Sequence, residues 1–146
     1  MALIPTQLAA TGKTVGPNPR IYPDGNDGVR PGDFIAGTDL LPVGMPLARN
    51  TSTGFWTPYA QAGANGTGTI RAFVYPDEIQ LVAAGEVVGQ MLRKGSVHRD
   101  DVNTAAIRAL CPGTDPTEAE LDTALRGGTP SLREMNIEVL GLAGVS

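Results

Sequence analysis

The sequence predicts a β-rich α+β fold, in which an extended N-terminal arm (residues 1–33) precedes a small β-barrel or sandwich body (residues 34–146). Glycine (19) and proline (12) make up about a fifth of the 146 residues. The average share is roughly 12%, so this composition favours turns and extended segments. Short apolar runs recur about every ten residues from 34 to 98, as in small barrels and sandwiches. The period then becomes helical, which predicts a two-helix insertion at about 99–131.

Residues 1–33 are predicted to form the arm because they are rich in proline and glycine and show no period of 2 or 3.6. The segment is nevertheless richer in apolar residues than a solvated linker. These residues are spaced like anchors that bury against a neighbouring surface: Leu3, Ile4, Leu8, Ile21, Tyr22 and Phe34.

The predicted body begins with a hairpin. Residues 44–49 form one strand, the turn cluster 50–54 follows, and residues 55–59 return. Phe55, Trp56 and Tyr59 form an aromatic patch that is interpreted as core or interface rather than as a ligand-stacking platform. Further strands are predicted at residues 69–75, 79–82, 87–92 and 137–142, and Lys94-Gly95 closes the third of these.

The insertion is predicted to contain two main helices. Asp100 and Asp101 favour a helix N-terminus, and Pro112-Gly113 ends this first helix. Its buried face is predicted to consist of Val102, Ala105, Ala106, Ala109 and Leu110. The second helix is capped by Asp115 or Thr117, buries Leu121 and Leu125, and stops at Gly127-Gly128. Residues 130–135 are expected to add a further helical turn.

Two motifs resemble ligand loops but lack required parts. Gly12-Lys13-Thr14 ends like a phosphate-binding loop, but Gln7 replaces its first glycine, and Pro17 and Pro19 prevent the helix that should follow. Residues 24–28 alternate acids and Asn like a calcium loop, but the fifth and twelfth positions are not acidic. A flexible segment and a turn are the preferred interpretations, and no cofactor is predicted.

No group of residues predicts catalysis or metal binding. Cys111 is the single cysteine and His98 the single histidine, so a small hydrolase that uses this pair is the weakest of three functional hypotheses. Cys111 ends an aliphatic helical stretch, where a cysteine is usually a small buried hydrophobe. The adjacent acids lie at turns and helix starts, and His98 lacks a second His or Cys at ligand spacing.

Charge and hydropathy narrow the expected partners. The net charge is −4 and no Lys/Arg cluster occurs along the chain, which argues against a nucleic acid partner. No apolar run reaches the length of about 18 residues that a membrane span needs, and the N-terminus does not look like a signal peptide. The lone cysteine excludes a disulfide scaffold. The protein is expected to stay in the cell that makes it, or in a particle assembled there.

Four stretches in order resemble the head decoration (capsid cement) proteins of tailed bacteriophages, the lambda decoration protein family in the broad sense. They read "GTDLLPVGMPLARNTSTGFWTPY", "IRAFVYPDEIQL", "GEVVGQMLRKGSVHRDDV" and "PSLREMNIEVLGL", and the similarity spans residues 38–142. The matching positions are Pro46, Leu47, Asn50, Gly54 and Trp56; Gly85, Gly89, Gly95 and Val97; and Leu132, Arg133, Ile137, Val139 and Gly141. The helical insertion is longer than in the smallest members.

The resemblance implies a small β-tulip-like domain that forms homotrimers. Such trimers sit on the outer surface of the expanded capsid in the virion, after assembly in the host cytoplasm. They hold neighbouring major capsid protein subunits together against the pressure of packaged DNA. The arm is expected to add to capsid strands. The second hypothesis is another structural virion protein, a tail or neck component.

Overall fold

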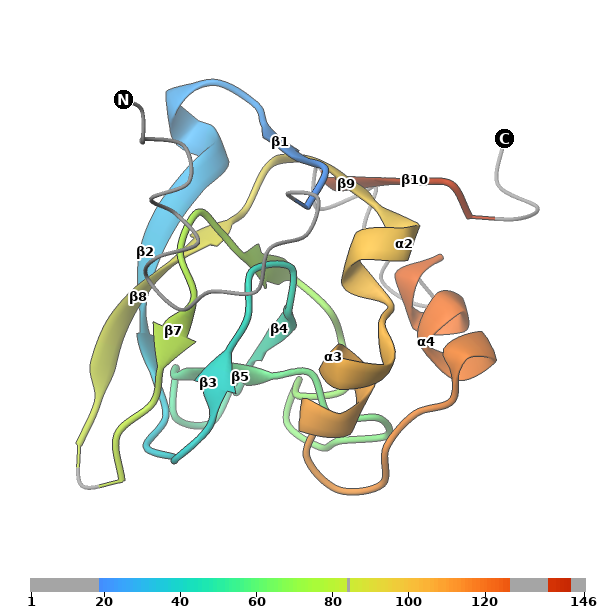
Figure 1. Cartoon of the computed structure of the whole chain (residues 1–146). Helices are drawn as coiled ribbons and strands as arrows, with labels where there is room; N and C mark the ends of the chain where they lie inside the picture. Colours follow the sequence, from blue (N-terminus) through green and yellow to red (C-terminus); the bar gives the residue numbers. More distant parts are fainter. Residues whose placement is uncertain (1–18, 84, 127–136, 143–146) are drawn as a thin grey trace, which may run out of the picture.

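The computed structural model describes residues 19–83, 85–126 and 137–142, and the strands dominate this part of the chain (Figure 1). The strands are β1 (Ile21–Pro23), β2 (Val29–Phe34), β3 (Leu40–Leu41), β4 (Pro46–Arg49), β5 (Trp56–Pro58), β6 (Ala72–Val74), β7 (Ile79–Gln80), β8 (Val87–Leu92), β9 (Gly95–His98) and β10 (Ile137–Leu140). The helices are the 3-10 turn η1 (Asn26–Gly28), α2 (Arg99–Val102), α3 (Ala105–Leu110) and α4 (Glu118–Leu125). None of the helices described is long and apolar enough to cross a membrane.

Five strands close into a barrel in the order β2-β5-β4-β6-β8. This confirms the β-rich body that the sequence predicts. The predicted hairpin is present, since Leu47 and Arg49 of β4 pair with Pro58 and Trp56 of β5. Its turn is stabilised by Asn50, whose Oδ1 accepts hydrogen bonds from the backbone N–H groups of Ser52 (2.8 Å) and Thr53 (3.2 Å). This side-chain turn explains why Asn ends the strand.

The barrel is narrow, and two glycines make room for its filling. A Cβ on Gly32 of β2 would lie 2.7 Å from Cδ1 of Trp56, and one on Gly89 of β8 would lie 2.5 Å from Cδ1 of Ile79. Both neighbours are large buried side chains. Because glycine has no side chain, the Trp56 ring can lie close to the backbone of β2 and the Ile79 side chain close to the backbone of β8. Side chains therefore fill the barrel interior, as expected for a barrel of few strands.

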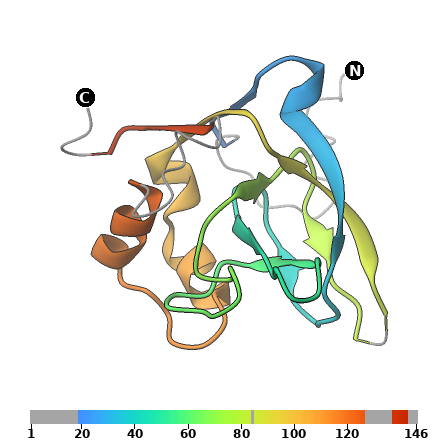
Figure 2. The same cartoon turned by 180° about the vertical axis from the view of Figure 1, so that it is seen from behind.

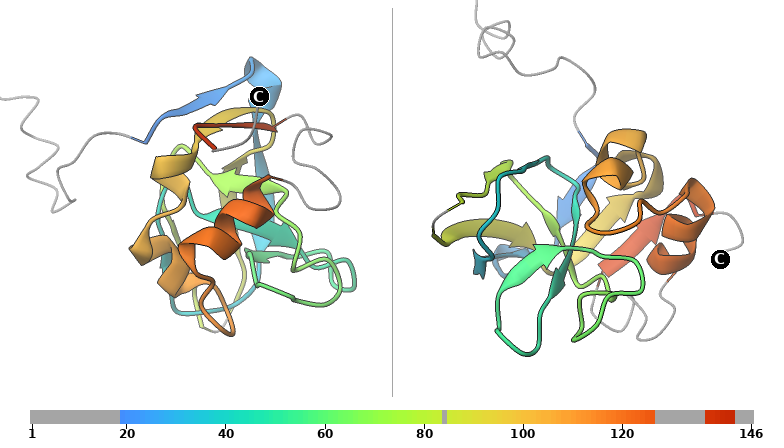
Figure 3. Two further views of the ribbon diagram at one scale, coloured as in Figure 1. Left: turned by 90° about the vertical axis from the view of Figure 1, so that its right-hand side faces the viewer. Right: turned by 90° about the horizontal axis from the view of Figure 1, so that it is seen from below.

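A second sheet has the order β1-β9-β10 (Figure 3, right panel). β9 lies in the middle, antiparallel to β1 and parallel to β10. The predicted strand at 137–142 is confirmed as β10, but β9 was not expected because Lys94-Gly95 looked like a terminator. Gly95 instead begins a new strand. β3 and β7 form a separate two-stranded ribbon.

The predicted arm is wrong over its described part. Residues 29–34 form β2, which pairs with β8 through all six of its residues, and residues 21–23 form β1. Ile21 is 5% exposed and Phe34 is fully buried in the barrel, so neither is a free anchor. Tyr22 is 55% exposed. Leu3, Ile4 and Leu8 lie outside the described residues.

Composition concealed these strands. β2 contains Pro31 and Gly32, which look like breakers in the sequence. However, β2 pairs with β5 at one position, Phe34 with Trp56. A strand with so short a ladder on one side has few hydrogen bonds to lose to a proline.

The helical insertion is present but divides differently. The first predicted helix is broken at Asn103 and Thr104 into α2 and α3, because Thr104 Oγ1 accepts from the N–H of Ile107 and caps a new helix. Val102 and Ile107 are buried, whereas Ala105, Ala106 and Ala109 are exposed, so the predicted alanine face is wrong.

The second helix is confirmed. Thr117 is the cap of α4 and forms a capping box with Glu120, and Leu121 and Leu125 are buried. The predicted stop at Gly127-Gly128 and the turn at 130–135 lie outside the described residues.

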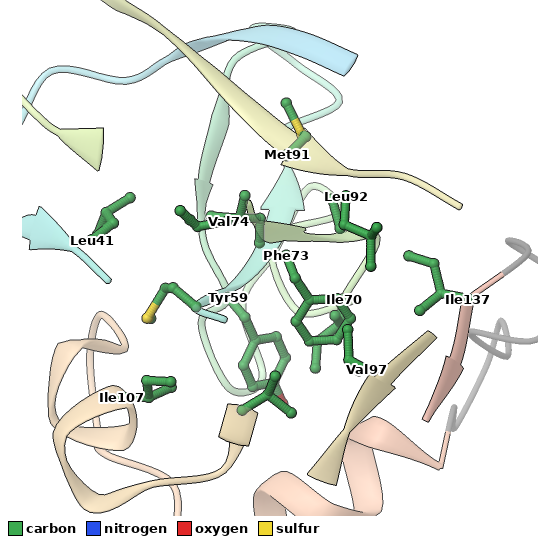
Figure 4. Packing of buried hydrophobic residues seen from close by; sticks show 14 of the residues in the cluster. Leu41, Tyr59, Ile70, Phe73, Val74, Met91, Leu92, Val97, Ile107 and Ile137 are labelled. Atoms are coloured by element: carbon green, nitrogen blue, oxygen red, sulfur yellow. The ribbon is translucent and has the colours of Figure 1, made fainter. Parts of the chain in front are cut away.

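One hydrophobic core joins the barrel, the helices and the second sheet (Figure 4). Phe73 and Leu92 come from barrel strands, Ile107 from α3, and Val97 and Ile137 from β9 and β10. The helices cover one flank of the barrel, and β2 and β8 lie on the other flank (Figure 2). The described part of the chain therefore folds around shared apolar contacts.

Candidate interaction surface

The predicted aromatic patch lies largely inside the protein. Trp56 and Tyr59 are each 5% exposed, and Phe55 is partly buried. The guanidinium carbon of Arg93 lies 4.8 Å from the centre of the Trp56 ring. Burial raises the pKa of the Tyr59 hydroxyl, and the neighbouring Cys111 and Glu120 add to this effect. Of the two interpretations left open for the patch, burial supports core for Trp56 and Tyr59.

Within the part of the chain that the structure describes, the second sheet presents an open outer face. Ile21, Val97 and Val139 face inward and are buried, and they alternate with Tyr22, Ser96 and Glu138, which form one row across the three strands. A groove of about 510 Å³ opens along this row, and we call it the sheet groove. Its lining residues are Tyr22, Pro23, Asp24, Gly95, Ser96, Ile137 and Glu138.

The start of the sheet is held in place by an ion pair. The backbone N–H and Nε of Arg20 both donate to Oδ2 of Asp101, each at 2.8 Å. These bonds from Arg20 lower the pKa of the Asp101 carboxyl, although partial burial opposes the shift. The chain therefore enters β1 at a defined point beside α2, next to the sheet groove.

A polar cluster joins the helices α2, α3 and α4. Arg99 of α2 donates to both carboxylate oxygens of Asp122 on α4, from Nε (2.7 Å) and Nη2 (2.8 Å). Asn103 is the buried polar residue of the described chain, and its Nδ2 donates to Asp122 Oδ1 (2.8 Å) and to the carbonyl of Glu118 (2.9 Å). Arg108 of α3 donates to Asn103 Oδ1 (2.6 Å). Bidentate pairs of this kind fix geometry as well as adding energy.

Replacing Asp122 by Asn is expected to lower the free energy of unfolding at pH 7 by about 2 kcal/mol, because charge-assisted hydrogen bonds contribute about 1.5–3 kcal/mol. Hydrogen bonds from Arg99 hold the pKa of Asp122 below its ordinary value. A lowered pKa stabilises the fold above about pH 4, and this contribution is lost as the pH falls through the folded pKa. Urea denaturation at pH 7 and pH 3 should show that the free energy of unfolding falls less between these two pH values in Asp122→Asn than in the parent.

Asp77→Asn is the matched control, since Asp77 is exposed and no side-chain partner is described for it. It should change stability by less than about 0.5 kcal/mol at either pH. An Asp122→Asn variant as stable as the parent at pH 7 would contradict the role given to the cluster.

Cys111 and His98 do not have the environment of a catalytic pair. Cys111 is 3% exposed, and burial raises the pKa of its thiol to about 11. A nucleophilic cysteine needs the opposite shift. The His98 ring accepts a hydrogen bond at Nδ1 from the N–H of Asp100 (3.2 Å) and caps α2. This arrangement gives the hydrolase hypothesis no support.

The loop motifs have structural partners where they are described. Gly12-Lys13-Thr14 lies outside the described residues. Asp24 pairs with Lys94 (3.8 Å) and Asp27 with Arg30 (3.5 Å), around η1. Within residues 19–83, 85–126 and 137–142, no three His, Cys, Asp or Glu side chains are grouped so that they could hold a metal ion.

One group of functional candidates is not visible in the sequence. Arg30, Arg49, Arg71 and Arg93 are separated by about 20 residues each along the chain, yet the barrel brings their charges together, as the shared effect on Arg93 shows. The available signal was that Arg49, Arg71 and Arg93 each lie at the edge of an apolar run.

No protein-family model matches the chain, and no curated protein matches it. Function is therefore inferred from the residues themselves and from the resemblance of the four stretches described above.

Proposed function

We propose that the protein is a structural virion protein that binds the outer surface of an expanded phage capsid. As a homotrimer it would join neighbouring major capsid protein subunits and strengthen the shell against internal DNA pressure. The order and spacing of the decoration-like stretches support the family. The feature that carries the proposal at residue level is the sheet groove, because it presents the half-exposed Tyr22 on the outer face of a three-stranded sheet.

The groove has the chemistry of a protein-binding surface. Tyr22 offers a large apolar ring and a hydroxyl, and tyrosine is common among the residues that dominate binding energy. Among residues 19–83, 85–126 and 137–142, no further strand pairs with the outer edges of β1 and β10, so a partner strand could extend this sheet. Three copies around a symmetry axis would present three grooves, and each weak contact would then gain from the others.

The proposal is tested with heads of the encoding phage that lack this protein. Cosedimentation should show saturable binding to expanded heads and much weaker binding to unexpanded shells. Tyr22→Ala should weaken binding at least about tenfold, the loss expected when a central tyrosine worth about 1.4 kcal/mol or more is removed. Val88→Ala is the matched control, since Val88 is 70% exposed on β8, outside the groove.

Equal binding of expanded and unexpanded shells would refute the expansion dependence, and no binding to either would refute the capsid proposal. Labelling that places the protein on tails or necks in electron micrographs would favour the second hypothesis. If Tyr22→Ala and a variant lacking residues 1–18 both bind like the parent, the groove is not the contact surface.

A further inference from the structure

Four arginines from four barrel strands lie at one end of the barrel. Arg30 is the second residue of β2 and Arg49 the last of β4, while Arg71 directly precedes β6 and Arg93 directly follows β8. β2 is antiparallel to β8, and β6 is antiparallel to both β4 and β8. The ends of β4 and β8 therefore lie beside the beginnings of β2 and β6. We call these four residues the arginine end.

Strand register and a ring contact place three of these residues on the side of the barrel wall that Trp56 occupies. Arg93 covers the ring at 4.8 Å, and Arg49 is the residue opposite Trp56 on the neighbouring strand. Arg30 is opposite Met91, whose side chain lies with the Trp56 ring against Gly32. Directly opposed side chains share a face of a sheet, so these guanidinium groups gather on the side of the wall that Trp56 occupies.

The positive charges are poorly balanced by the rest of the described chain. The Nε of Arg49 donates to a backbone carbonyl, that of Gly54 (3.1 Å), and Arg30 makes a long 3.5 Å contact with the exposed Asp27. The Nε of Arg71 is buried without a hydrogen-bond partner among the described residues. Burial lowers the pKa of Arg93, and the charges of the other three arginines lower it further. The only other ion pair described nearby joins Lys94 to Asp24.

We propose that the arginine end binds the carboxylate groups of an acidic segment of a partner protein. Guanidinium groups pair with carboxylates in a planar, bidentate geometry, and such charge-assisted hydrogen bonds are about twice as strong as neutral ones. All four groups are arginines, which suit this pairing better than lysines. Residues 1–18 contain no Asp or Glu, so this occupant is not the chain's own N-terminal segment.

A nucleic acid fits this surface less well. Trp56 is 5% exposed and already covered by Arg93, so it offers no face on which a base could stack. The proposal stands apart from capsid binding, because it holds for any partner with such a segment.

The single tryptophan is a built-in reporter for the test. The full chain is titrated with a hexaglutamate peptide at low and at high salt, and the emission of Trp56 is followed. We expect a saturable change that high salt weakens, and none with hexaglutamine. Arg71→Gln keeps the stacking of Arg93 on Trp56 and should weaken binding about tenfold, the effect of one charge-assisted hydrogen bond.

Arg126→Gln, at the end of α4, is the control and should bind like the parent. Calorimetry repeats the titration without relying on fluorescence, and melting curves establish that the variants are folded. Absence of saturable hexaglutamate binding, or equal binding by Arg71→Gln, would overturn the proposal. Binding of tripolyphosphate or an oligonucleotide in place of hexaglutamate would also overturn it, whatever the outcome of the capsid experiment.

Discussion

Deletion of residues 1–33 is expected to abolish cooperative folding. The deletion removes β1 and all of β2 except Phe34, and with them the six-residue ladder that closes the barrel against β8. β8 and β5 would become open edges, and the apolar interior would meet water. Domains of this size are stable by only about 5–15 kcal/mol, so losing a barrel strand exceeds what the remainder can offset. Circular dichroism should show no cooperative thermal transition.

Deletion of residues 1–18 is the matched control and should leave a cooperative transition, because every contact of the described body remains. Phe34→Ala gives an intermediate case and should cost about 3–5 kcal/mol, as expected for a fully buried phenylalanine. A cooperative melt of the 1–33 deletion close to that of the parent would contradict the place given to β2. The two deletions also show which truncated variant can be used in the capsid-binding experiment. A variant that does not fold would fail to bind whether or not the deleted residues contact the capsid.

Local patterns predicted the elements that local chemistry specifies. The hairpin of β4 and β5, the strand β8 and the cap of α4 depend on neighbouring residues, such as Asn50 in its turn and Thr117 with Glu120. β1 and β2 were hidden by Pro23, Pro31 and Gly32, whose cost depends on ladder partners far along the chain. The break between α2 and α3 follows from the burial of Asn103 and the cap at Thr104, which a helical period alone does not reveal.

Of the two candidate surfaces, the sequence indicated one residue of the sheet groove and nothing of the arginine end. Tyr22 was singled out from the sequence as an anchor, but as part of an arm rather than of a three-stranded sheet. The arginine end could not be predicted, because only barrel closure brings together residues about 20 positions apart. The two surfaces belong to different sheets, so substitutions can separate capsid binding from carboxylate binding.

Gly95→Ala is expected to lower the free energy of unfolding by about 3 kcal/mol, through backbone strain and overpacking that cost about 1–3 kcal/mol each. Gly95 has a φ of +143°, and its Cβ would lie 2.2 Å from the carbonyl oxygen of Tyr22 and 2.9 Å from Cα of Pro23. Both are backbone atoms, so β1 has to move away from β9, and the sheet groove opens with it. Differential scanning calorimetry should record a melting temperature lower by roughly 10 °C.

Two other glycines separate the causes of this loss. Gly113 has a φ of +79° and nothing within 4 Å of its Cβ position, so Gly113→Ala measures strain alone, about 1 kcal/mol. Gly85 has neither a positive φ nor a close neighbour, since the nearest atom is 3.7 Å away, and Gly85→Ala should be nearly neutral. Hydrogen exchange in Gly95→Ala should accelerate in β1 before the barrel strands. If Gly95→Ala costs no more than Gly113→Ala, the close packing of β1 on β9 does not constrain residue 95.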